Sequence, residues 1–313
     1  MWSKKPRREL LTIKHKVFAF SHHKLKSTEK TFIKNHRIPL EVFLVCFVDV
    51  EVTMSSLGVE LKPNQEPDKR DFLTRIIFRL DFSANVDVSE KKRRAFSTAI
   101  EEEFSAPQLE TRKSIQFTMG EEGNFLAEGQ ARFYHFTNKD GTRKVILEPT
   151  ALVVLFFSGA NAEELSSTLN SVGNGFNEAY EKMTAIRTGL RYTYRLDKLG
   201  NGPLDWNRFI SKNLTSTIDF YSNPDELAKV ISSIELTKEN YRVTMQAGLA
   251  NSIDYPNPIR SGEFVLDYDC YSAENKTIPA ALELIDIFNK EISDLFILST
   301  TEELRRITEE QNA

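Results

Sequence analysis

Residues 187–197 have the sequence Arg187-Thr-Gly-Leu-Arg-Tyr-Thr-Tyr-Arg-Leu-Asp197, in which apolar and polar side chains alternate. Alternation with a period of two is typical of a β-strand that has one buried face. The last seven residues of the stretch, which begin at Arg191, are nearly repeated upstream as Arg75-Ile-Ile-Phe-Arg-Leu-Asp81, an offset of 191 − 75 = 116 residues. The near-repeat predicts a chain built from two related halves, each opened by a strand of this kind.

The residues after each of these strands predict the same order of elements in both halves: a helix, three or four strands and a second helix. In the first half we expect strands at 72–83, 114–119, 124–138, 144–148 and 151–157, and helices at 90–104 and 162–186. In the second half we expect strands at 187–197, 228–236, 241–249 and 262–272, and helices at 205–214, 279–296 and 300–307. Asp140-Gly141 predicts a hairpin turn. Gly173 and Gly175 predict a kink in their helix or its close approach to the sheet.

This order of elements predicts an α+β protein whose antiparallel sheet carries its helices on one face. We place the first α+β half at 54–186 and the second at 187–313. In topology, two tandem β-α-β(3-4)-α repeats resemble the saddle of the TATA-binding protein. That resemblance concerns architecture and implies no function.

The first 53 residues differ in charge from the rest of the chain. They hold 11 Lys and Arg against 5 Asp and Glu, a net charge of +6, whereas the remainder holds 30 against 40, a net charge of −10. We therefore place a boundary there, with 1–53 as a basic N-terminal extension. Three interpretations stay open: a misassigned start with translation from Met54, a disordered basic arm, or an arm that binds nucleic acid or membrane.

Composition limits the class of protein. The 313 residues, 40% hydrophobic and 27% charged, are typical of a soluble globular protein. Two cysteines, Cys46 and Cys270, cannot form a disulfide framework, and we expect both to be inert buried thiols. The apolar run Val42–Val48 is far too short to span a bilayer, and no signal-peptide pattern precedes it. We expect a cytoplasmic protein with no membrane association.

The polar faces of the predicted strands supply the candidate binding residues. Arg187, Arg191 and Arg195 share one face, successive arginines lying about 13 Å apart at roughly 3.3 Å per residue. Arg75 and Arg79 occupy the upstream strand, and the strand at 262–272 carries three carboxylates on one face: Glu263, Asp267 and Asp269. Two interpretations compete. The arginines and carboxylates form a ladder of cross-strand salt bridges, or the arginines present an anion-binding face.

Candidates for catalysis are few. His135 is the only histidine after residue 53, and it lies in an aromatic strand where we expect a structural role. The chain contains no phosphate-binding glycine loop, metalloprotease motif or nucleophile elbow. Asp267 and Asp269 are a weak signal for a cation, and Glu101–Glu103 is interpreted as a solvated helix face. We therefore predict no catalytic residues, no metal and no cofactor. The motifs of the sequence favour a protein that is not an enzyme.

The stretch at 187–196 resembles a sporadically distributed, uncharacterised bacterial protein family marked by an R-x-G-L-R-Y-x-N-R-[IL] strand. Arg187, Gly189, Leu190, Arg191, Tyr192, Arg195 and Leu196 fit, while Tyr194 stands where Asn is usual. Similarities extend over about 72–307, including the Leu266-Asp-Tyr-Asp269 strand and the Leu284-Ile-Asp-Ile-Phe288 helix. The resemblance implies a bacterial cytoplasmic protein of accessory, patchily inherited type. It supplies no catalytic residues.

These observations favour a non-enzymatic binding protein whose ligand is another protein, by analogy of immunity, antitoxin or defence type. One alternative is a nucleic-acid-binding protein that uses the arginine-bearing face, although the acidic charge of 54–313 disfavours it. Another is a small-ligand binder or enzyme with a pocket between sheet and helices. The sequence makes no prediction about the oligomeric state.

Overall fold

The computed structural model describes residues 72–312, apart from gaps at 121–122, 158–159, 198, 200–203, 222, 224–225, 251–256 and 260–261. The chain divides into two units, Met1–Asn64 and Gln65–Ala313, and all described residues belong to the second. The predictions made for 1–53, including the boundary and the start at Met54, lie outside the described residues.

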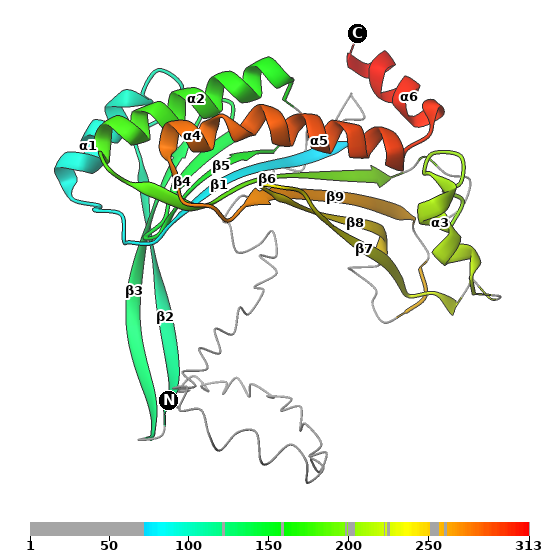
Figure 1. Ribbon diagram of the computed structural model, residues 1–313, viewed down its shortest axis with the longest axis horizontal. Helices are drawn as coiled ribbons and strands as arrows, with labels where there is room; N and C mark the ends of the chain where they lie inside the picture. Colours follow the sequence, from blue (N-terminus) through cyan, green and yellow to red (C-terminus); the bar gives the residue numbers. More distant parts are fainter. Residues whose placement is uncertain are drawn as a thin grey trace, which may run out of the picture. The chain divides into compact units, whose positions relative to one another are not determined.

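One antiparallel sheet of ten strands forms the framework of the second unit (Figure 1). Its strands are β1 (Leu73–Phe82), β2 (Gln108–Gly120), β3 (Gly123–Thr137), β4 (Arg143–Leu147), β5 (Ala151–Phe156), β6 (Thr184–Asp197), β7 (Lys229–Thr237), β8 (Arg242–Ala250), β9 (Glu263–Ser272) and β10 (Lys276–Thr277). The spatial order is β2-β3-β4-β5-β1-β6-β9-β8-β7, and β10 pairs with β6.

The two strands with the near-repeated sequence lie side by side at the centre of the sheet. β1 and β6 are antiparallel, with Ile77 opposite Arg191 and Asp81 opposite Arg187. Strands of the first half therefore continue from one side of this pair and strands of the second half from the other. The second half has no counterpart of β2 among the described residues. A duplicated origin and the likeness to the TATA-binding-protein saddle stay predictions.

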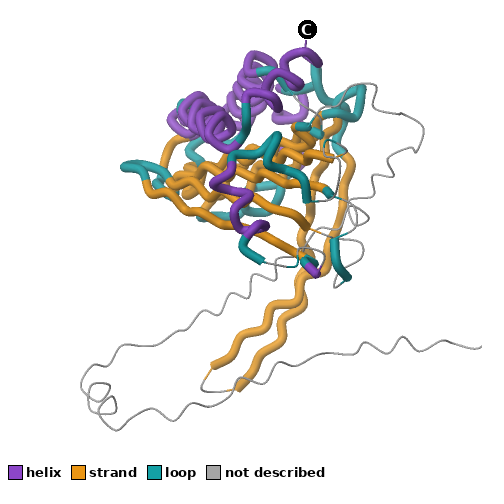
Figure 2. The backbone as a smooth tube through the Cα atoms, turned by 90° about the vertical axis from the view of Figure 1, so that its right-hand side faces the viewer, coloured by secondary structure: helices purple, strands orange, loops and turns teal. Residues whose placement is uncertain are grey.

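The helices cover one face of this sheet (Figures 1 and 2). They are α1 (Glu90–Ala99), α2 (Ala162–Ala179), α3 (Lys212–Asp219), α4 (Ile278–Leu282), α5 (Leu284–Ser299) and α6 (Glu302–Asn312). The predicted α+β class with an antiparallel sheet is thus confirmed. Within the described ranges, no helix combines the length and the hydrophobicity that a membrane span requires.

The main core lies between the sheet and the helices. Alternate residues of the strands point into it, such as Ile76, Phe78 and Leu80 of β1, each at most 1% exposed. Phe82 stacks on Phe176 of α2 with 5.1 Å between ring centroids. This period-two burial is the reason that the strands were predictable from the sequence.

A second, smaller apolar cluster lies on the other face of the sheet. Its buried members come from β4 and β5: Ile146, Ala151, Val153 and Leu155. All six residues of β5 are consequently buried.

Several predicted boundaries were wrong. The helix at 162–186 ends at Ala179, because Lys182 adopts a positive φ of 70° and the chain re-enters the sheet at Thr184. The helix expected at 90–104 ends at Ala99 in a hydrogen-bonded turn. The helix expected at 279–296 is divided at Glu283 into α4 and α5. The strand expected at 114–119 is the longer β2.

The helix predicted at 205–214 was also wrong. Trp206 and Ile210 are buried, but they belong to a turn in which the Ile210 N–H donates to the Trp206 carbonyl at 2.9 Å. The helix α3 begins only after Ser211. The apolar spacing that suggested a helix is satisfied by this turn, which puts the same side chains into the core.

The two glycines of α2 allow close packing between helices. A Cβ atom on Gly173 would lie 2.6 Å from Leu282 of α4, and one on Gly175 would lie 2.8 Å from Ala99 of α1. The helix is continuous through both positions. The close approach that the glycines predicted is therefore to neighbouring helices rather than to the sheet.

Candidate functional site

The face of the sheet opposite the helices carries a dense band of charged side chains. All eight predicted binding and ion-pairing residues come together there, on β1, β6 and β9, with Asp81 and Glu148 beside them. We call these ten residues the arginine–carboxylate band: Arg75, Arg79, Asp81, Glu148, Arg187, Arg191, Arg195, Glu263, Asp267 and Asp269. The alternation that buries the even-numbered residues of β6 and β9 directs the odd-numbered ones to this face.

The arginines of β6 pair diagonally with the carboxylates of β9. Arg191 lies opposite Asp269 in the strand register, yet its Nε donates to Asp267 at 2.8 Å. Arg195 forms an ion pair with Glu263 in the same diagonal sense. The Thr193 hydroxyl donates to the second oxygen of Asp267 at 2.9 Å. Asp267 is thus held from two neighbouring positions of β6.

The side chain of Arg187 runs in a different direction, which the absence of a side chain on Gly189 allows. Its guanidinium lies over Gly189, where a Cβ atom would approach Nη1 to 3.0 Å. It also lies over the Tyr271 ring, 4.9 Å from the centroid. From there Nη2 donates to Asp269 at 3.1 Å, and Nη1 lies 3.7 Å from Asp81. Arg187 therefore links carboxylates of β1 and β9 across β6.

The arginines of β1 extend the band towards the first half. Arg79 donates to Asp81 at 2.7 Å and lies 3.1 Å from Glu148. Burial lowers the pKa of Arg75, and the positive charges of Arg191 and Arg195 lower it further. Burial also raises the pKa of Asp269, against the opposing effects of Arg187 and Arg191. Three guanidinium groups therefore lie close enough to repel one another beside the carboxylates that balance them.

The predicted salt-bridge ladder therefore exists, although its register could not be predicted. Five arginines accompany five carboxylates in the band, so their formal charges cancel. Two of the arginines remain half exposed, with side-chain exposures of 49% for Arg191 and 46% for Arg195. The band is consequently a neutral, patterned surface of both signs.

The side chain of His135 is buried beside the second apolar cluster and connects two strands. It is 5% exposed, and its Nε2 lies 2.7 Å from Glu110 Oε2. Glu110 also accepts a hydrogen bond of 2.7 Å from Arg112, whose guanidinium lies 4.5 Å from the centre of the Phe133 ring. Burial lowers the pKa of His135, and the nearby Lys144 lowers it further. The imidazole is therefore neutral at pH 7 and joins β3 to β2.

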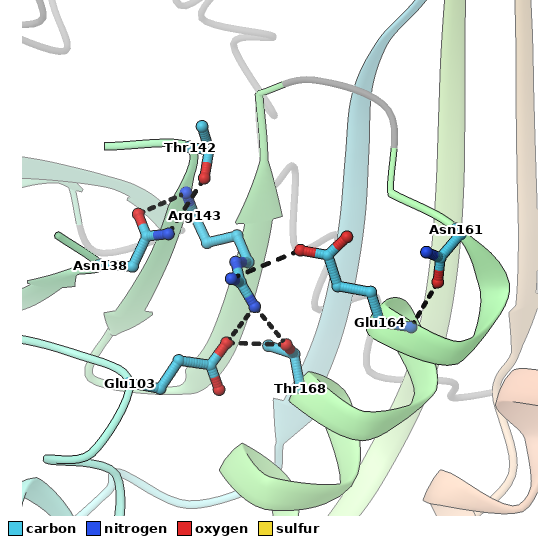
Figure 3. A network of polar contacts seen from close by, with 7 residues as sticks. All are labelled: Glu103, Asn138, Thr142, Arg143, Asn161, Glu164 and Thr168. Carbon is cyan, nitrogen blue, oxygen red and sulfur yellow. Dashed lines mark hydrogen bonds and ion pairs between the residues drawn. The ribbon is translucent and has the colours of Figure 1, made fainter. Parts of the chain in front are cut away.

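Sequence reasoning missed a polar network between α2 and the β3–β4 hairpin (Figure 3). Arg143 pairs with Glu103, donates to the Thr168 hydroxyl at 2.8 Å and lies 3.4 Å from Glu164. The Thr168 hydroxyl donates to Glu103 at 2.8 Å. The interpretation of Glu101–Glu103 as a solvated helix face was thus wrong for Glu103. No local signal marks this network, because its members come from separate elements.

The described residues offer little for catalysis or metal binding. Among them, no group of three or more His, Cys, Asp and Glu side chains could hold a metal ion. A groove of about 300 Å³ lies within the helical layer, between α2 and α4, rather than between sheet and helices. Its lining is Ser166, Asn170, Asn174, Pro279, Leu282, Glu283 and Asp286. Cys270 is buried, and burial raises the pKa of its thiol.

Fold and site together define an α+β protein with one helix-covered and one charged sheet face. Comparisons with protein-family models and with curated proteins find no match for the chain. The likeness to a sporadic bacterial family therefore stays an expectation from the sequence.

Proposed function

We propose that this protein is a non-enzymatic binding protein, and that the arginine–carboxylate band is where it contacts a partner protein. The observation that carries the proposal is the balance of charge in a partly exposed band. Five arginines and five carboxylates share this face, nine of them on the adjacent strands β1, β6 and β9 and Glu148 just after β4, with Arg191 and Arg195 half exposed. Protein surfaces carry both signs of charge and can complement such a pattern in one register only.

The same balance argues against nucleic acid as the ligand. A phosphate backbone presents a single sign of charge and is bound by an excess of Lys and Arg. Asp267 and Glu263 lie directly beside Arg191 and Arg195 and would repel phosphate. The net negative charge of 54–313 would also repel the phosphate backbone of a nucleic acid.

A charge swap separates binding from stability. The double variant Arg195→Glu/Glu263→Arg retains an ion pair between β6 and β9 but reverses the pattern that a partner meets. The matched control is Arg94→Glu/Glu90→Arg, which swaps an exposed pair in α1. Partners would be recovered from the native host with each tagged protein and identified by native mass spectrometry, and affinity would then be measured for the purified partner.

We expect both variants to melt close to the unmodified protein. The control should bind normally, whereas the sheet variant should lose at least about tenfold in affinity. Equal binding by both variants would overturn the assignment of the band. Fluorescence anisotropy with DNA and RNA oligonucleotides at low salt tests the alternative, and salt-dependent binding that the sheet variant abolishes would favour nucleic acid instead.

A further inference from the structure

The strand β7 ends the sheet on the side of the second half. Its nine residues all pair with β8, from Lys229 opposite Ala250 to Thr237 opposite Arg242. In the part of the chain that the structure describes, no strand lies on its other side. An edge strand presents backbone N–H and C=O groups that can pair with a further strand.

Comparison of the two halves shows where such a strand belongs. Outward from the centre, the first half runs β1, β5, β4, β3 and β2, and the second runs β6, β9, β8 and β7. The strand β7 therefore occupies the position of β3, and β3 has β2 outside it along thirteen paired residues. The described residues of the second half supply no strand for the equivalent place.

The side chains of β7 are unusual for an edge exposed to water. Ile231 is 45% exposed and Ile234 is 42% exposed, one on each face of the strand. Edge strands are normally protected by charges along their length, but β7 carries only Lys229 near one end and Glu235 near the other, both exposed. These two charges are opposite in sign.

The positions of the charges make β7 complementary to itself. An antiparallel second copy related by a two-fold axis at Ser232 would place Lys229 of each copy opposite Glu235 of the other. The same register would place Val230 opposite Ile234, both β-branched, on the face towards the helices. Opposite charges directly across two strands stabilise a sheet, and the facing Val230 and Ile234 add apolar contact between the two copies.

We propose that two copies of this chain associate through β7, in antiparallel register about Ser232, to form one continuous sheet. The pairing satisfies the backbone groups of both edges and shields Ile231 and Ile234. It uses a different strand from the arginine–carboxylate band and does not depend on the function proposed for that band.

Charge variants test this register. Lys229→Glu or Glu235→Lys alone would set like charges opposite each other at both ends, and the double variant would restore the attraction. Sedimentation velocity and native mass spectrometry on the full chain should find a dimer that weakens at least about tenfold in each single variant and recovers in the double variant. The control, Lys290→Glu at an exposed position of α5, should dimerise normally.

Three results would overturn the proposal: a monomeric unmodified protein at about 100 µM, single variants that dimerise normally, or a double variant that does not recover. Glu235 also lies 3.6 Å from Arg242, so a melting curve for each variant must first show an intact fold.

Disulfide trapping gives a second measurement of the same register. In a Cys46→Ser background, Ser232→Cys should cross-link two copies on mild oxidation, because adjacent strands hold facing Cα atoms within disulfide range. Ser233→Cys would lie opposite Ile231 and should cross-link poorly. Equal trapping at both positions, or none at Ser232→Cys, would contradict the two-fold axis at Ser232.

Discussion

The guanidinium of Arg187 packs closely over Gly189, where a larger side chain would crowd it. A Cβ atom at Gly189 would lie 3.0 Å from Arg187 Nη1 and 3.3 Å from Cζ. A glycine inside a strand weakens it, and here it permits a close approach that brings Arg187 to Asp269. This contact explains the Arg-x-Gly spacing of the sequence, because the side chain of Arg187 lies along its own strand and over Gly189.

The first prediction concerns this contact. Gly189→Ala should push the Arg187 guanidinium aside by a few tenths of an ångström and weaken its contact with the partly buried Asp269, at a cost of less than about 1 kcal/mol in the free energy of unfolding. The measurement is denaturant unfolding. The control is the same substitution in an Arg187→Met background, where no guanidinium has to move and the cost should be smaller. An equal cost in both backgrounds would show that the contact is unimportant.

A second prediction concerns the diagonal pair Arg191–Asp267. In a double-mutant cycle with Arg191→Met and Asp267→Asn, we expect a coupling free energy of about 0.5–1 kcal/mol, since Arg191 is half exposed. Asp267→Asn should be the more costly single change, because Asp267 is buried and also accepts from Thr193. A coupling near zero would mean that the ion pair does not stabilise the sheet.

A third prediction concerns the network around Arg143. Arg143→Met leaves Glu103, with a side-chain exposure of only 24%, without its cationic partner. We expect a loss of about 2–3 kcal/mol, measured by urea unfolding. Arg94→Met removes an exposed pair of α1 and should change stability by less than about 0.5 kcal/mol. Similar losses in the two variants would show that the network behaves as an ordinary surface pair.

A fourth prediction concerns pH. Because burial, followed by the effect of Lys144, lowers the pKa of His135 below its usual 6.5, the folded protein binds fewer protons than the unfolded chain near that pH. The stability that the neutral imidazole contributes is therefore complete above about pH 6.5 and is lost as pH falls towards the lowered pKa. The hydrogen bond from Arg112 also lowers the pKa of Glu110, which acts with the same sign at lower pH.

Thermal unfolding of the unmodified protein and His135→Gln, from about pH 8 to pH 5, measures this effect. The stability of the unmodified protein should fall more steeply below pH 6.5 than that of the variant. Parallel curves would exclude His135 as the cause.

The strands were predictable because each of their side chains is assigned to a face by its immediate neighbours in sequence. This is why the arginines of β6 could be assigned to one face. The boundaries of α2 and α3 depended on turns at Lys182 and Trp206, where tertiary contacts override local spacing.

The partners within the site were harder to predict than its members. A sequence shows that Arg191 and Asp267 lie on polar faces, but the choice between Asp267 and Asp269 depends on the strand register and on side-chain direction. Arg143 and Glu103 are 40 residues apart and meet because Phe104, next to Glu103, forms a β-bridge with Asn138. No periodic pattern in the sequence predicts a contact of this kind.

The place of β1 between β5 and β6 has a consequence for synthesis on the ribosome. A nascent chain that has just completed α2 at Ala179 already contains β1 to β5, yet β6 begins only at Thr184 and is not yet available. Until it emerges, one side of β1 is a bare edge in the middle of the future sheet. A chain stopped at that point would be prone to pair with its neighbours, so the half-finished protein is the form most in need of a chaperone.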